Sequence, residues 1–163
     1  MKNKVLVGIG SNTGDKFANI EKAIEILTGK KEISGLKSSS LYETLPYGVE
    51  DQPNFINCAV SFYSGLNLKD LFFFLKETEK KIGRIERFRW GPREIDLDLL
   101  FFGDVIYNDE EITVPHPGIE KRDFVIVPAA EIEGKFYFPG KSIRLEEMNT
   151  DLLKKNIVRK IMN

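Results

Sequence analysis

Two aspartates, Asp96 and Asp98, are the residues whose type and spacing most directly suggest chemistry in this sequence. They alternate with apolar residues in the run IDLDLLFF at 95–102, and this alternation predicts a β-strand with both carboxylates on one face. At a rise of about 3.3 Å per residue, their Cα atoms would lie roughly 6.6 Å apart. Two carboxylates at that spacing can converge on one cation or on two adjacent cations, so the pattern predicts a divalent-metal site.

An arginine-rich segment directly precedes this strand. Four arginines, Arg84, Arg87, Arg89 and Arg93, surround the Trp-Gly-Pro sequence at 90–92. Because Gly and Pro interrupt regular structure, the segment is predicted to be a loop, which the tryptophan helps to close. Guanidinium groups keep their charge and bind phosphate oxygens in a bidentate manner. A loop of this kind beside two carboxylates suits a complex of Mg²⁺ with a polyphosphate.

Three other interpretations compete with this one. The aspartates could belong to the solvated face of a sheet and the arginines to an ordinary surface loop, although Thr, Lys or Glu are more usual on such a face. A ligand-binding module without catalysis would not need two carboxylates opposite an arginine loop. A metal-dependent hydrolase or nuclease could use the carboxylates, but a nuclease would need a broader basic surface than a net charge of -1 indicates.

Length and composition describe a single domain over residues 1–163. The single cysteine, Cys58, cannot form an internal disulfide, which fits a reducing compartment, and it is expected in the core. The apolar run at 5–9 is too short for a signal peptide or a membrane span. We therefore expect a cytoplasmic protein that binds neither nucleic acid nor a membrane.

The remaining elements follow from periodicity and from capping residues. Asp15 and Asn67 are expected to cap two helices that end at Gly29 and Gly83. The other expected elements are strands at 5–10, 33–42, 54–64 and 136–138, a helix at 120–131 and an amphipathic terminal helix within 145–163 whose role is unknown. This order predicts an α+β sandwich with helices on one face of a sheet and the other face open for ligands. The glycines near the N-terminus fit neither a dinucleotide fingerprint nor a Walker loop.

Several further residues could contribute to a ligand site, although each has an ordinary structural explanation. Phe55 and Asn57 point to the same side of the strand at 54–64, where they could stack on a flat heterocycle and hydrogen-bond its edge, or simply pack. His116 lies between two prolines and could donate to a phosphate or be structural. Arg122 and Phe124 would add a cation and a second stacking face near the start of a helix.

Three segments together resemble the 6-hydroxymethyl-7,8-dihydropterin pyrophosphokinase family: RWGPREIDLDLLFFG at 89–103, GSN at 10–12 and VPHPGIEKRDFVIVPAAEI at 114–132. The resemblance extends from about residue 5 to residue 140. It implies a ferredoxin-like α+β fold, a split βαβ sandwich with additional C-terminal elements. It also implies a monomeric Mg²⁺-dependent diphosphokinase of folate biosynthesis, which transfers pyrophosphate from ATP to the hydroxymethyl group of the pterin and releases AMP.

The resemblance also implies roles for individual residues. Asp96 and Asp98 would hold two Mg²⁺ ions and act in catalysis with Arg84 and Arg93, and Asp96 would also accept a hydrogen bond from the pterin hydroxyl. The ATP-binding residues would be Glu79, Arg89, Trp90, His116 and Arg122. The pterin-binding residues would be Thr44, Leu45, Tyr47, Phe55, Asn57 and Phe124, with the two phenylalanines as stacking faces.

Two departures from the family pattern leave roles open. The arginine loop is one residue shorter than in some members, so Glu86 and Arg87 compete for the place of a second loop arginine, and Arg87 receives no role. His116 is followed by Pro117, where some relatives carry a tyrosine, which leaves the nucleoside contact there open.

Overall fold

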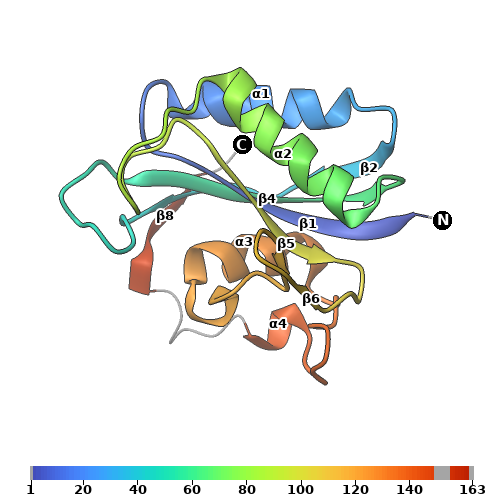
Figure 1. The fold of residues 1–163 in the computed structure, drawn as a ribbon. Coiled ribbons are helices and arrows are strands. Elements are labelled where there is room, and N and C mark those ends of the chain that lie inside the picture. Colours follow the sequence, from blue (N-terminus) through green and yellow to red (C-terminus); the bar gives the residue numbers. More distant parts are fainter. Residues whose placement is uncertain (1, 149–154, 162–163) are drawn as a thin grey trace.

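The computed structural model describes residues 2–148 and 155–161, which form one main antiparallel sheet with helices on both faces (Figure 1). Its strands are β1 (Asn3–Ser11), β2 (Ile33–Ser38), β3 (Leu41–Thr44), β4 (Phe55–Ser64), β5 (Asp96–Phe102) and β8 (Ile157–Ile161). A small separate hairpin joins β6 (Tyr107–Asn108) to β7 (Thr113–Val114). The helices are α1 (Lys16–Thr28), α2 (Leu68–Ile82), the 3-10 turn η1 (Ile119–Lys121), α3 (Asp123–Glu133) and α4 (Leu145–Met148).

The strand order β5-β1-β4-β3-β8, with β2 also paired to β4, confirms the ferredoxin-like split βαβ arrangement. The strand predicted at 33–42 is divided into β2 and β3, which pair with different parts of β4. The division lies at Ser39, whose hydroxyl accepts a hydrogen bond from the backbone of Ala59 at 2.9 Å. The interruption falls within the three consecutive serines at 38–40.

Helices α1 and α2 begin and end where the capping residues predicted. The Asp15 carboxylate accepts from the backbone of Ala18 at 3.0 Å, and the Asn67 side chain accepts from Asp70 at 2.8 Å. Gly83 ends α2 with φ of 112°, a conformation that glycine adopts at little cost. Both helices lie on one face of the sheet and share a core with the inward residues of β4, Cys58 among them.

The second face of the sheet is not fully open, so that expectation is wrong in part. Helix α3 and the segment around α4 cover one half of it (Figure 1), where Leu6, Leu100 and Phe101 are buried against them. The helix predicted at 120–131 is present as η1 followed by α3. The uncovered half of this face begins at the carboxyl-terminal end of β1 and carries the site.

The terminal helix expected within 145–163 is also wrong for most of its described part. Leu145–Met148 is α-helical, whereas Ile157–Ile161 is the strand β8, paired antiparallel with β3. Residues 149–154 and 162–163, which the expectation also included, lie outside the described residues. The strand expected at 136–138 is reduced to a single bridge between Tyr137 and Arg144. Across the two described ranges, no helix is both long and apolar enough to cross a membrane.

Candidate active site

The floor of the site is formed by three neighbouring strands in register. Gly10 on β1 lies opposite Asn57 on β4 and opposite Asp96 on β5, and Gly8 lies opposite Asp98. A Cβ atom at Gly10 would come within 2.5 Å of the Asn57 Oδ1 atom. The absence of a side chain at position 10 therefore lets the amide of Asn57 lie across β1 and keeps the floor open.

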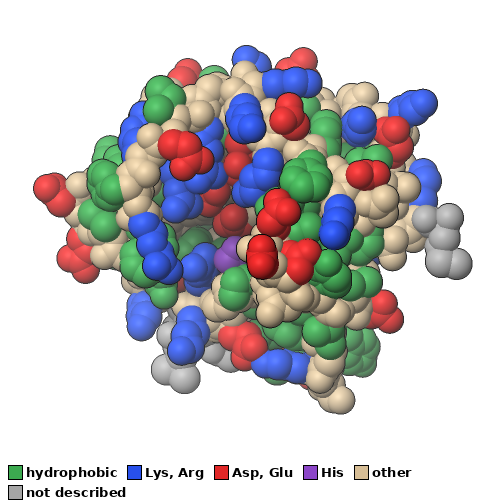
Figure 2. Space-filling model, viewed as in Figure 1, with side chains coloured by type: hydrophobic (Ala, Val, Ile, Leu, Met, Phe, Trp, Pro, Cys, Tyr) green, Lys and Arg blue, Asp and Glu red, His purple; other side chains and the backbone are tan. Residues whose placement is uncertain are grey.

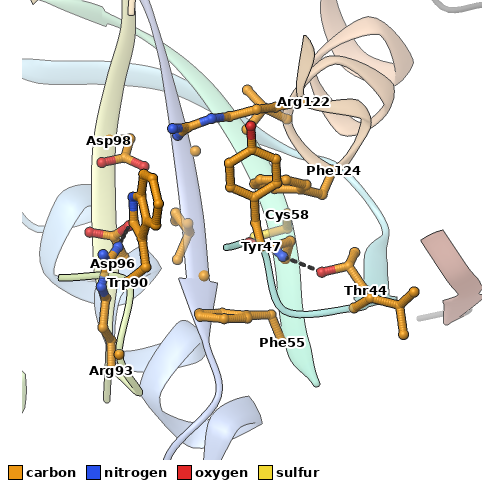
Figure 3. A pocket seen from close by; sticks show the side chains of 17 residues that line it. Thr44, Tyr47, Phe55, Cys58, Trp90, Arg93, Asp96, Asp98, Arg122 and Phe124 are labelled. Atoms are coloured by element: carbon orange, nitrogen blue, oxygen red, sulfur yellow. Dashed lines mark hydrogen bonds and ion pairs between the residues drawn. The ribbon is translucent and has the colours of Figure 1, made fainter. Parts of the chain in front are cut away.

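Asp96 and Asp98 share this face, as the alternation predicted, and both line one cavity (Figure 3). Asp96 accepts hydrogen bonds from Arg84 at 2.9 Å and from Arg93 at 2.8 Å. Burial alone would raise the pKa of Asp96, but the charges of Arg93 and Arg84 outweigh it and lower the pKa below its ordinary value. Asp96 is therefore ionised and already paired with two guanidinium groups.

Asp98 has a different environment. Burial raises its pKa to about 8, and the negative charge of Asp96 adds to the rise. His116 is the nearest cationic candidate, with Nε2 at 4.0 Å from Asp98 Oδ1. Burial and the charge of Arg122 lower the pKa of His116, which favours its neutral form. Asp98 thus lacks the cationic partners that Asp96 has, and a positive ion at this position would satisfy it.

Glu79 connects the end of α2 to the acid pair. Its carboxylate accepts from Arg84 at 3.0 Å and from the backbone of Leu97 at 2.7 Å, and the residue is buried. Burial raises the pKa of Glu79, although the ammonium of Lys76, 3.5 Å away, opposes the rise. Glu79 therefore orients an arginine in this structure. Its contact with ATP stays a prediction.

The arginine loop closes over the site through Trp90. Trp90 has a φ angle of 60°, a backbone conformation that residues other than glycine rarely adopt. Its carbonyl oxygen accepts a hydrogen bond from the Gln52 side chain at 2.8 Å. Its ring packs on Gly48, where a Cβ atom would come within 2.6 Å of the indole. Arg89 stacks on the same ring, with its guanidinium 4.6 Å from the ring centroid. The loop is therefore held against the segment that precedes β4.

Arg87, to which the sequence assigned no role, pairs with Glu94 across the base of the loop. The two guanidinium nitrogens of Arg87 donate to Glu94 at 2.9 and 2.6 Å, and Arg87 also donates to the carbonyl of Pro92. The competing residue, Glu86, is exposed. Arg87 thus holds the loop together in this structure.

The opposite end of the cavity is aromatic and polar. All six residues predicted to bind pterin line it: Thr44, Leu45, Tyr47, Phe55, Asn57 and Phe124. Phe55 and Phe124 project toward it from β4 and α3 (Figure 3), and Asn57 donates to the Thr44 hydroxyl at 2.7 Å. The Tyr47 ring lies 5.7 Å from the Phe124 ring and 6.2 Å from the Trp90 ring.

The arginines predicted to act in catalysis and the residues predicted to bind ATP fall into two groups. Trp90, Arg93 and Arg122 line the same cavity as the acid pair. The cavity lining does not include Arg84, Glu79, Arg89 and His116. Three of these contact a lining residue: Arg84 contacts Asp96, Arg89 contacts Trp90 and His116 lies near Asp98. The fourth, Glu79, contacts Arg84. Figure 2 shows the result at the surface, where Lys and Arg side chains gather around acidic side chains and the single histidine lies beside them.

Two residues near the site were missed from the sequence. Asn12 is buried and joins three segments: it donates to Gln52 at 2.9 Å and to the carbonyl of Pro53, and it accepts from the backbone of Arg93 at 2.8 Å. Lys76 approaches the acid cluster from α2. The asparagine of GSN was quoted for the resemblance, but its burial could not be anticipated. Lys76 had no signal beyond lying one turn before Glu79.

The chain is similar in sequence to proteins of one enzyme family. The sequence profile of the 7,8-dihydro-6-hydroxymethylpterin-pyrophosphokinase (HPPK) family matches residues 6–134. The 2-amino-4-hydroxy-6-hydroxymethyldihydropteridine pyrophosphokinase of Aquifex aeolicus is 44% identical over 135 residues, covering 83% of each chain. The Bacillus subtilis protein of the same name is 39% identical over 132 residues, covering 81% of this chain and 79% of the relative.

Larger proteins contain a similar region. The mitochondrial folate synthesis bifunctional protein of Pisum sativum is 40% identical over 131 residues, which cover 80% of this chain and 25% of the relative. Among solved structures, Plasmodium falciparum HPPK-DHPS with pteroate superposes with a TM-score of 0.73 at 12% identity, over 96% of this chain and 45% of that chain. The structural match supports the fold alone. With the profile and the bacterial relatives, these findings show that the chain belongs to the 7,8-dihydro-6-hydroxymethylpterin-pyrophosphokinase family.

Proposed function

We propose that this chain carries out its family's pyrophosphate transfer in the cavity above Gly10, with Mg²⁺ as the required ion. ATP would be the donor, the hydroxymethyl group of 6-hydroxymethyl-7,8-dihydropterin the acceptor, and AMP and the pterin diphosphate the products. One observation carries the proposal. The paired carboxylates and the arginines lie at one end of a cavity whose other end offers two aromatic faces and an amide.

The donor groups fit magnesium that arrives with a nucleotide. Mg²⁺ prefers oxygen ligands and commonly binds through one or two carboxylates, with substrate phosphates and water completing its shell. Asp96 and Asp98 would hold two such ions, and the described ranges contain no group of three or more side chains that could bind a metal without a substrate. Bound Mg²⁺ would neutralise phosphate charge and polarise the phosphoryl oxygens.

The arginines would then act on the transferring group. Arg84 and Arg93 both contact Asp96, so each guanidinium is already aimed at the place where the polyphosphate would lie. Glu79 accepts a hydrogen bond from Arg84 and so holds its guanidinium in place. This lowers the entropic cost of ordering Arg84 around the substrate. Fixed charges of this kind stabilise negative charge that develops during transfer. Trp90 would close the loop over the phosphates and exclude water.

The pterin would occupy the aromatic end of the cavity. Phe55 and Phe124 would stack on its ring, and the Asn57 amide, Thr44, Tyr47 and the backbone near Leu45 would surround its edges. Asp96, which is ionised, would accept a hydrogen bond from the pterin hydroxyl. His116, Arg122, Arg89 and Glu79 would assist with the nucleotide.

The remaining expectations concern the protein's surroundings. A net charge of -1 gives no electrostatic reason for binding nucleic acid. We propose a monomer that acts on small molecules in the cytoplasm.

The test replaces each carboxylate and follows AMP release from ATP, the reduced pterin alcohol and Mg²⁺. Asp96→Ala and Asp98→Ala are each expected to lower kcat by about a thousandfold, because each removes a ligand of the ions that neutralise the phosphates. The matched control is Asp104→Ala, an exposed aspartate in the turn after β5. Normal turnover in both site variants would refute the metal assignment.

Calorimetry separates the enzyme from a simple binding module. Binding of a non-hydrolysable ATP analogue is expected only with Mg²⁺, and pterin binding is expected to change when the analogue is present. Pterin binding that is indifferent to Mg²⁺ and nucleotide, without AMP release, would instead identify a non-catalytic module.

A further inference from the structure

Asn156, the residue before β8, contacts the two segments that carry Leu45 and Phe124 at the proposed pterin end of the cavity. The carbonyl of Asn156 accepts from the backbone of Leu45 at 2.8 Å. On its other side, Asn156 donates to the Asp123 carboxylate twice, from its backbone at 2.7 Å and from its side-chain amide at 3.0 Å. Leu45 lines the cavity, and Asp123 directly precedes Phe124, which also lines it. One residue thus joins the two walls.

The contact with Asp123 is buried. Asp123 is 1% exposed, and its carboxylate also accepts from the backbone of Phe124 at 2.9 Å. A buried carboxylate is costly unless hydrogen bonds replace its water, so the first turn of α3 is stable only where the donors of Asn156 reach it. Asp123 is also the first residue of α3, where a negative charge is favourable. The position of Asn156 therefore fixes where α3 begins and where Phe124 points.

A second contact from β8 reaches the other stacking face but is weaker. Arg159 donates to Glu43 at 2.8 Å, and Glu43 accepts from Asn54, the residue before Phe55. The Arg159 side chain is 67% exposed, so solvent screens this ion pair. Arg159 lies three residues after Asn156, within β8, yet lacks a buried partner, which makes it a matched control.

We propose that Asn156 is a positioning residue for pterin recognition, which sets the distance between the Leu45 wall and the Phe124 face. The proposal rests on the proposed function, since it takes the aromatic end as the pterin subsite. It adds a residue beyond 134, where the family profile ends. It also gives a role to the C-terminal segment, for which the sequence suggested no chemistry.

The first experiment measures binding of 6-hydroxymethyl-7,8-dihydropterin, and separately of a non-hydrolysable ATP analogue with Mg²⁺, by calorimetry. Asn156→Asp sets a carboxylate against that of Asp123 and is expected to weaken pterin binding about tenfold, while nucleotide binding changes less than about threefold. Asn156→Ala, which keeps the backbone donor, is expected to weaken it less. Arg159→Ala is expected to stay within about twofold of wild type for both ligands.

A compensating exchange separates positioning from general destabilisation. Adding Asp123→Asn to Asn156→Asp removes the repulsion between the two carboxylates and reverses the side-chain hydrogen bond. One backbone N–H group, that of Phe124 or of Asn156, then loses its acceptor, so the double variant is expected to recover part of the pterin affinity. Equal losses for pterin and nucleotide, or a lower Tm with unchanged pterin affinity, would overturn the proposal. If Asn156→Asp does not fold, Asn156→Ala decides by the same criteria.

A measurement without ligand keeps this proposal distinct from the proposed function. Hydrogen exchange of the amides at 123–126 is expected to accelerate in Asn156→Ala but not in Arg159→Ala. Unchanged exchange would overturn the positioning role even in an active enzyme. If the exchange result holds but wild type releases no AMP, the function assignment fails and the structural link stands.

Discussion

Asp96 and Asp98 carry the same side chain two positions apart, yet their neighbours move their pKa values in opposite directions. Asp96 receives two guanidinium groups, whereas the pKa of Asp98 is raised by burial and by the charge of Asp96, and its nearest partner is a half-buried histidine. The strand alternation predicted that the two carboxylates share a face, but not this difference. It arises from side chains that lie far away in the sequence or on another element.

The Arg87–Glu94 pair gives a prediction at this scale. The Arg87 guanidinium lowers the pKa of Glu94 to about 2, below its ordinary value of 4.5. A group whose pKa is lower in the folded protein stabilises it above pH 4.5, and this contribution is lost as the pH falls toward 2. Glu94→Gln is therefore expected to cost about 1 kcal/mol at pH 7, a modest amount because solvent screens the pair.

Urea denaturation at several pH values checks this expectation. The difference between wild type and Glu94→Gln should narrow steadily between pH 5 and pH 3. Glu86→Gln, at an exposed position of the same loop, serves as the control and should show no such trend. A difference independent of pH would mean that the ion pair is not its cause.

Some site residues could be predicted from local sequence patterns, whereas residues that act through long-range contacts could not. Phe55, Asn57, Asp96 and Asp98 point into the cavity as strand alternation required, because that pattern is local. The pterin residues on loops were found only through the resemblance. Asn12, which was missed, acts through contacts between segments distant in sequence, which no local pattern contains.

Among the elements, the arginine loop depends most on unusual backbone conformations. Trp90 and Gly48 both have positive φ, and the indole occupies the space that a side chain at position 48 would need. Gly48→Ala is expected to displace Trp90, to lower kcat about tenfold and to cost about 1–2 kcal/mol of stability. Trp90 is the single tryptophan, so its fluorescence reports on the loop directly.

Gly35→Ala is the control for this prediction. Gly35 has φ of 65° on β2, away from the site, so it should lose a similar amount of stability while its tryptophan emission and turnover stay those of wild type. Unchanged emission and kcat in Gly48→Ala would show that the loop does not need this contact.

The elements also show where sequence patterns fail. Capping residues located α1 and α2 correctly because the cap hydrogen bonds are made within four residues. The apolar spacing within 145–163 predicts a terminal helix. At Ile157–Ile161 the chain instead pairs with β3, more than a hundred residues away, and such tertiary pairing overrides local preference.

The whole molecule consists of one sheet between two cores, which serve different purposes. The core under α1 and α2 supports the strands, and the core under α3 supports the wall that carries Phe124. The order of elements predicted the core under α1 and α2, because that core follows from the split βαβ pattern. It did not predict the second, since the packing of α3 on the sheet depends on side chains spread over many segments.

Phe101 tests the second core. It is fully buried on β5, with ring centroids 5.1 Å from Phe136 and 5.3 Å from Phe138. Phe101→Ala is expected to cost about 3–5 kcal/mol of unfolding free energy through lost burial and the cavity left behind. Turnover well below the unfolding transition should stay within about threefold of wild type, because the Phe101 side chain lies outside the active-site cavity.

Denaturation monitored by circular dichroism gives the unfolding free energy. Tyr137→Ala, which removes a half-exposed ring from the same region, should cost far less and is the control. A near-zero cost for Phe101→Ala would mean that this half of the molecule contributes little to cooperative folding.

Gly10 has a consequence for inhibition. Because the Asn57 oxygen would meet a Cβ atom there at 2.5 Å, any larger residue at position 10 must push aside an amide that the substrate is proposed to need. Resistance to an inhibitor that packs directly against Gly10 would therefore be difficult to achieve by placing a larger residue at that position. A cell that depends on this chain for the proposed reaction would lose that reaction along with its sensitivity.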